Sequence, residues 1–157
     1  MIVLRALVLL MTSQVLLAQE PVLSPDAPPD RPVSGTEQTK AKIEEAIQPY
    51  IDQAKATYPA ARERFVAGLP EGHSFFVTTR IRDRSGTFEQ VFIAVRAIED
   101  GRVVGRIWSQ IQLVRGFKFG DRYSLPESEI VDWLITRPDG SEEGNFVGKF
   151  LDTYGGT

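Results

Sequence analysis

Hydrophobic residues recur along this chain at two spacings, first a helical one and later at every second position. From Ile43 to Ala54 the apolar side chains stand three or four residues apart, which predicts a helix with one buried stripe. Pro49 falls inside this pattern, where proline costs about 3 kcal/mol, so we expect a kink or two shorter helices there. Pro59 is expected to begin another short helix over Ala60–Ala67.

From Ser74 onward apolar and polar residues alternate, which is typical of half-buried strands. Ser74 opens the first strand, and Thr87–Ile98 forms a second that is apolar on both faces near its middle and therefore central. Between this strand and the next, Asp100-Gly101 predicts a two-residue hairpin turn with positive φ at both positions.

Further strands are predicted towards the end of the chain. Arg102–Val114 returns as a third strand, in which Gly105 marks a bulge or a close backbone approach. Arg122–Leu125 and Ser128–Thr136 follow, whereas periodicity does not decide between strand and helix for residues 144–151. Helices followed by strands predict an α+β domain: an antiparallel sheet of about five strands with N-terminal helices packed on one face.

The first eighteen residues have the pattern of a secretory signal peptide. Arg5 precedes an apolar run, and Ala18 offers a small residue for cleavage. An uncleaved membrane anchor is the alternative, although polar residues interrupt the run and a span takes roughly 20 residues. We therefore expect a periplasmic or secreted protein with no membrane span after cleavage.

Residues 19–33 contain half of the ten prolines in the chain, which predicts a disordered linker. Ser34 and Glu37 have the spacing of a capping box at the start of a helix. We expect one folded domain over residues 34–157.

Composition excludes several kinds of chemistry. The chain has no cysteine, one histidine and a net charge of −3, with no basic run. We therefore expect no cysteine-ligated or multi-histidine metal site, no cofactor and no nucleic-acid partner. A triad of His73 with Ser74 or Ser109 has no nucleophile-elbow pattern to support it.

Asp132 and Trp133 are the first candidates for a site. On a strand, Asp132 shares a face with Ile130 and Leu134, an apolar setting that raises a carboxylate pKa and suits an acid or base. The alternative is a structural carboxylate that accepts backbone N–H groups, such as those around Asn145. Trp133 points to the other face and is most simply a core residue.

Glu89 is a second carboxylate on an apolar face, together with Val91 and Ile93. If that face meets the one that bears Asp132, the two carboxylates form the minimal pair for hydrolytic acid–base chemistry. A strand-end carboxylate paired with an arginine is the alternative interpretation.

Arginines gather on neighbouring predicted strands and turns, where they form a basic patch suited to an anionic polymer or protein partner. Cross-strand pairing with Asp83, Glu89 and Glu99 is the alternative. The arginines concerned are Arg80, Arg82, Arg84, Arg96, Arg102 and Arg106.

A series of short motifs resembles a known family, DUF2314, also called YegJ-like. The motifs are Pro59, Arg64-Phe65, Gly68 to Gly72, Glu89 to Phe92 with Val95, Gly105 to Ile107, Gly120-Asp121, Ile130 to Trp133, Asp139-Gly140, Glu143 to Asn145 and Gly148. The resemblance spans roughly residues 54–152 and implies a small α+β fold and export. It implies no activity, cofactor or substrate.

Two functional hypotheses follow from these patterns. The first is an exported, non-catalytic binding or accessory domain for an envelope protein or anionic polymer, with Asp132, Trp133, Asn145, Arg80 and Arg96 as binding residues. The alternative is a small envelope hydrolase that uses Asp132 and Glu89.

Overall fold

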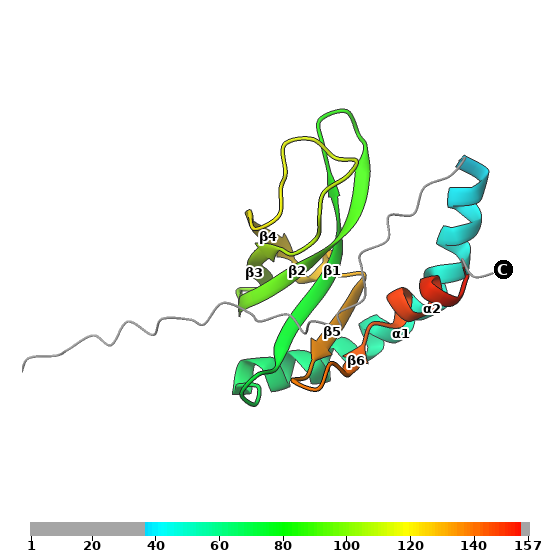
Figure 1. Cartoon of the computed structure of the whole chain (residues 1–157). Helices are drawn as coiled ribbons and strands as arrows, with labels where there is room; N and C mark the ends of the chain where they lie inside the picture. Colours follow the sequence, from blue (N-terminus) through cyan, green and yellow to red (C-terminus); the bar gives the residue numbers. More distant parts are fainter. Residues whose placement is uncertain (1–36, 155–157) are drawn as a thin grey trace, which may run out of the picture.

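The computed structural model describes residues 37–154, which form a six-stranded antiparallel sheet and two α-helices (Figure 1). The strands lie in the order β4-β3-β2-β1-β5-β6. The α+β prediction is confirmed, with one strand more than expected. The elements are α1 (Glu37–Ala67), β1 (Ser74–Arg82), β2 (Phe88–Glu99), β3 (Arg102–Ile107), β4 (Arg122–Pro126), the 3₁₀ turn η1 (Glu127–Glu129), β5 (Asp132–Thr136), β6 (Glu142–Gly144) and α2 (Phe146–Tyr154).

The predictions for the beginning of the chain are not tested by this structure. The expected signal peptide (1–18), the proline-rich segment (19–33) and the side chains of the expected capping box lie outside the described part of the chain. Of the helices within residues 37–154, none combines the length and the apolar character needed to cross a membrane.

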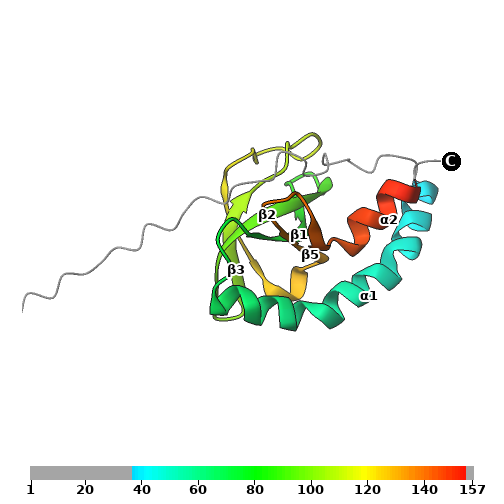
Figure 2. The same ribbon diagram turned by 60° about the horizontal axis from the view of Figure 1, so that its bottom comes forward.

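Helix α1 is continuous, so two shorter helices at Pro49, one of the two expected alternatives, and a separate helix from Pro59 were wrong. Both prolines are exposed, so each missing backbone hydrogen bond lies on the solvent side of the helix. Figure 2 shows that α1 follows a curved path around the rest of the molecule. Curvature that is convex towards solvent accommodates proline without ending the helix.

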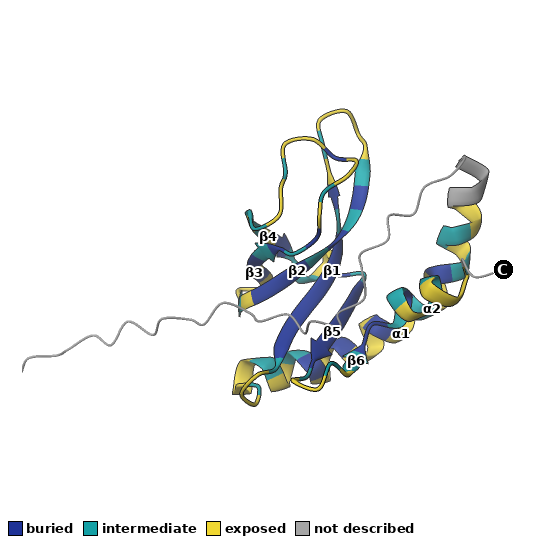
Figure 3. Cartoon of the chain, viewed as in Figure 1, coloured by how far each residue is buried: buried dark blue, intermediate teal, exposed yellow. Residues whose placement is uncertain are grey.

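The main core lies between α1 and one face of the sheet, as expected. Ala54, Tyr58 and Ala61 pack there with Phe75 and Trp133. Figure 3 shows the burial concentrated along the central strands, whereas the loops at one end of the sheet are exposed. The second half of α1 is therefore fixed to the sheet by apolar contact.

The apolar side of the first half of α1 packs on α2. Ile47 and Ile51 form a small cluster with Val147, and the rings of Tyr50 and Phe150 stack with their centroids 4.5 Å apart. Residues 144–151, whose structure the sequence left undecided, therefore contribute the end of β6 and most of α2.

The predicted turn and the predicted bulge of the central hairpin are both confirmed. Asp100 and Gly101 have φ values of 50° and 71°. The pairing of β2 with β3 shifts register between Val95 and Ala97, next to Gly105. A Cβ atom at Gly105 would overlap the carbonyl oxygen of Ala94, so glycine permits a close backbone approach at this bulge.

Two strand boundaries differ from the predictions. Strand β3 ends at Ile107 and is followed by a loop over residues 108–121. The turn η1 delays the start of β5 to Asp132, which changes the phase of the alternation. Ile130 consequently packs in the main core with Trp133, and not on the face of Asp132 as predicted.

Substituting Gly105→Ala tests the close approach at the β2–β3 bulge. We expect the free energy of unfolding to fall by about 1–3 kcal/mol, because the new methyl group must displace backbone atoms of β2. Denaturant unfolding measures the change, and Val104→Ala, at an exposed position of the same strand, is the matched control. Equal stability of the two variants would contradict this account of Gly105.

Candidate functional site

Asp132 lies at the junction of β5 and α2, where its carboxylate receives backbone N–H groups. One oxygen, Oδ1, accepts the N–H of Trp133 at 2.8 Å, and Oδ2 accepts the N–H of Val147 at 2.7 Å. Val147 is the second residue of α2, so Asp132 performs from another element the role of a helix N-cap. The prediction that nearby backbone groups satisfy this carboxylate is confirmed.

Burial controls the proton affinity of Asp132, which is only 1% exposed. Removal from water raises the pKa of Asp132 from 3.8 to about 6, and the N–H groups of Val147 and Trp133 oppose that rise. The buried position of this carboxylate thus determines its pKa.

Asn145 lies beside Asp132 at the start of α2, but its side chain faces another partner. Its backbone has a positive φ of 56°, a conformation that asparagine adopts more readily than most residues. Its Nδ2 donates to Oε2 of Glu142 at 2.8 Å, and its N–H donates to the carbonyl of Trp133. Asn145 therefore shapes the β6–α2 corner.

Trp133 connects the sheet to α1. Its indole Nε1 donates to the carbonyl of Ala54 at 3.2 Å and to Oγ1 of Thr57 at 3.0 Å. Its ring is buried between Phe75 and Phe146. Trp133 is thus the core residue that the sequence indicated, held by a helix on one side.

Glu89 anchors the loop over residues 108–121 by accepting three consecutive backbone N–H groups. Its carboxylate receives the N–H groups of Gln112 at 3.0 Å, Leu113 at 2.8 Å and Val114 at 3.2 Å. Successive N–H groups that converge in this way form an anion-binding nest. This contact turns the predicted end of the third strand into a loop.

The two carboxylates of the predicted hydrolase lie on opposite faces of the sheet. Glu89 is paired with Ile81, on the face of Trp133, whereas Asp132 is paired with Thr78, on the other face. Each carboxylate is already occupied by backbone donors. Asp132 and Glu89 therefore do not form an acid–base pair, and the paired-carboxylate hydrolase is not supported.

The two arginines predicted to bind a ligand are not brought together with Trp133. Arg80 forms an ion pair with Glu44 of α1 at 2.7 Å, and its guanidinium lies 5.8 Å from the ring centroid of Phe88. Arg96 is exposed on β2 near the bulge. Within residues 37–154, neither arginine forms a hydrogen bond or ion pair with Asp132 or Asn145.

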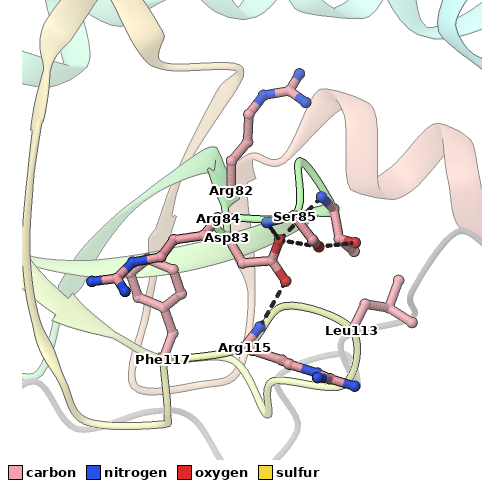
Figure 4. A pocket seen from close by; sticks show the side chains of 9 residues that line it. Arg82, Asp83, Arg84, Ser85, Leu113, Arg115 and Phe117 are labelled. Carbon is pink, nitrogen blue, oxygen red and sulfur yellow. Dashed lines mark hydrogen bonds between the residues drawn. The ribbon is translucent and has the colours of Figure 1, made fainter.

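A pocket of about 830 Å³ opens at the end of the sheet where the β1–β2 turn meets the loop over residues 108–121. Figure 4 shows Asp83 at its centre, with Arg82, Arg84 and Arg115 extending from the rim in different directions. Leu113 and Phe117 add apolar surface. We call this region the arginine pocket, and its positively charged residues are Arg82, Arg84 and Arg115.

Asp83 fixes the two segments of the arginine pocket to each other. Its Oδ1 accepts the N–H of Ser85 at 2.9 Å and the N–H of Thr87 at 3.2 Å, and its Oδ2 accepts the N–H of Arg115 at 3.1 Å. The hydroxyl of Ser85 and the N–H of Arg115 lower the pKa of Asp83. This carboxylate is thus used by backbone and hydroxyl groups, and not by the arginine side chains around it.

A second pocket, of about 580 Å³, lies beside Trp133, but its charged groups already have partners within the protein. Arg64 contacts Glu143 at 2.6 Å, and Arg137 contacts the same carboxylate at 3.0 Å. Nζ of Lys149 donates to the carbonyl of Gly144. The arginine pocket differs because, within residues 37–154, Arg84 and Arg115 form no ion pair with a carboxylate.

Sequence reasoning identified Arg82 and Arg84 as part of a basic patch but missed Arg115. Arg115 follows directly on residues that were predicted to be a strand, and only the contacts to Glu89 and Asp83 bring it to the β1–β2 turn. Across the described residues, no group of three or more Asp, Glu or His side chains is arranged to hold a metal ion.

The proton affinity of Asp132 predicts a pH dependence of stability. The folded chain, with a pKa of about 6 at this site, binds more protons than the unfolded chain between about pH 4 and pH 6. The contribution of Asp132 to the free energy of unfolding therefore falls as the pH rises through that window. The total fall is roughly 3 kcal/mol, since each pKa unit corresponds to about 1.4 kcal/mol.

Unfolding free energies of the wild type and of Asp132→Asn, measured from pH 4 to pH 7, test this expectation. The variant does not titrate at this position, so the difference between the two proteins should shift in favour of the wild type at low pH. Carboxylates with lowered pKa values, such as Glu143, are present in both proteins and cancel in the difference. A difference that is constant with pH would contradict the assignment.

Comparisons with known proteins identify the family. Neither the curated proteins nor the solved structures include a match to the chain. A family model described as an uncharacterized protein conserved in bacteria (DUF2314) matches residues 38–154, which cover the whole sheet, all of α2 and all of α1 except its first residue. The chain belongs to the DUF2314 family of bacterial proteins.

Proposed function

We propose that this protein is an exported, non-catalytic binding module that holds an anionic partner at the arginine pocket. One observation carries the proposal: Arg82, Arg84 and Arg115 surround a pocket whose central carboxylate, Asp83, is occupied by backbone N–H groups. Guanidinium groups bind carboxylates and phosphates through paired hydrogen bonds, so the pocket selects for negative charge.

The surroundings of the pocket support this selectivity. The whole chain has a net charge of −3, yet the residues that line the pocket include three arginines and a single carboxylate, Asp83. The nearby Glu89 is only 5% exposed and directed to the backbone of residues 112–114. The local field is therefore positive on an acidic protein, which attracts an anionic partner and repels a cationic one.

The buried carboxylates favour a binding role over a catalytic one, because backbone N–H groups already occupy them. Asp132 and Glu89 each accept backbone N–H groups, and neither lines the arginine pocket. A general acid or base must reach the proton that it transfers. The carboxylates nominated by the sequence are engaged in holding α2 and the loop.

Removal of two arginines tests the binding site directly. We expect Arg84→Ala/Arg115→Ala to bind dextran sulfate roughly tenfold more weakly for each arginine lost, because a hydrogen bond to a charged group contributes about 1.5 kcal/mol or more. Neither side chain has a hydrogen bond in the described structure, so the fold should be unaffected, as a circular dichroism melt will show. Retention on dextran sulfate at increasing salt concentration measures the change.

The matched control removes the same charge elsewhere. Lys42 and Lys55 are exposed on α1, and Lys42→Ala/Lys55→Ala should elute at the salt concentration of the wild type. Uncharged dextran should retain none of the proteins. Equal elution of the wild type and the double arginine variant would overturn the proposed site.

Export is supported by the apolar run after Arg5 and by Ala18, the features of a signal peptide. We expect the chain recovered from the bacterial envelope or medium to begin near residue 19. N-terminal sequencing of the fractionated protein measures this. A chain that retains Met1 and stays in the cytosol would refute export.

A further inference from the structure

We infer that the arginine pocket takes a linear, non-peptide polymer with an oxyanion on each repeat unit, such as an acidic polysaccharide. This inference rests on the proposed function and specifies its ligand. Three features of the pocket lead to it: the directions of the arginines, the apolar lining and the use of the backbone donors.

The arginines do not converge on one point. In Figure 4 the side chains of Arg82, Arg84 and Arg115 extend in three different directions around Asp83. One carboxylate or phosphate cannot contact all three guanidinium groups in this arrangement. Several anionic groups spaced along one molecule can engage them together, and each additional contact then forms at a high effective concentration.

The pocket is also too large for a single oxyanion. Its volume of about 830 Å³ lies within the range of sites for drug-sized ligands, and its lining includes Leu113 and Phe117. Leu113 is 46% exposed, so apolar surface is available between the cations. A sugar ring presents C–H groups to such surface while its acidic substituent reaches an arginine.

Many backbone donors near the pocket are already used, which argues against a peptide that adds to the sheet as a strand. Asp83 accepts the N–H groups of Ser85, Thr87 and Arg115, and Glu89 accepts those of residues 112–114. A peptide that adds to a sheet needs a row of free backbone groups. The pocket offers side-chain cations and apolar surface instead, which suit a chain without amide groups.

Calorimetric titration with oligogalacturonates of increasing length tests the inference. Binding should strengthen more than tenfold from the monomer to an oligomer that reaches all three arginines. The double variant Arg84→Ala/Arg115→Ala should lose this dependence on length, while Lys42→Ala/Lys55→Ala should keep it. Polyglutamate with the same number of carboxylates should bind more weakly than the oligogalacturonate.

Each alternative ligand gives a different result. If orthophosphate or monomeric galacturonate binds as tightly as the oligomers, the site takes a compact anion and the inference is wrong. If polyglutamate binds as tightly or more tightly, the ligand is a peptide and the inference is wrong, although the proposed function stands. If dextran sulfate and all these anions fail to bind, the proposed function fails together with the inference.

Discussion

Backbone N–H groups that leave a sheet or begin a helix still need acceptors, and in this fold carboxylates provide several of them. Asp132 holds the start of α2, Glu89 holds residues 112–114, and Asp83 joins the β1–β2 turn to Arg115. A buried N–H group without a partner costs about 1–3 kcal/mol. The positions of α2 and of the middle of the long loop therefore depend on these acids, in addition to the apolar contact between α2 and α1.

The backbone contacts of Asp83 and Glu89 also affect the charge of the surface. Asp83 and Glu89 are close in sequence to the arginines of β1 and β2, and cross-strand pairing would have neutralised both signs. Because the two carboxylates accept backbone N–H groups instead, the side chains of Arg84 and Arg115 extend outward without a carboxylate partner among the described residues. A constraint that organises the loop thus also produces a local positive field.

Local signals in the sequence predicted the parts of the fold that local chemistry decides. Positive φ at Asp100 and Gly101 and the bulge at Gly105 follow from the residues themselves. Pro49 misled the prediction, because apolar contact along α1 outweighs a missing hydrogen bond on its exposed side. The end of β3 could not be predicted, since it depends on the contact between Glu89 and the backbone of Leu113, which is 24 residues further along the chain.

The candidate residues fall into two groups: those that hold the fold together and those that line the arginine pocket. Asp132, Trp133 and Asn145 match the family motif and do lie together, but their polar groups bind the backbone or neighbouring side chains that assemble β5, β6, α1 and α2. A match at these positions therefore identifies the fold and carries no information about a ligand. The arginine pocket is built from the β1–β2 turn and from the loop over residues 108–121, and this loop is held by Glu89, another residue of the family motifs. The arginines that line the pocket are not among the motif residues, so the motifs account for the scaffold of the pocket and not for its charge.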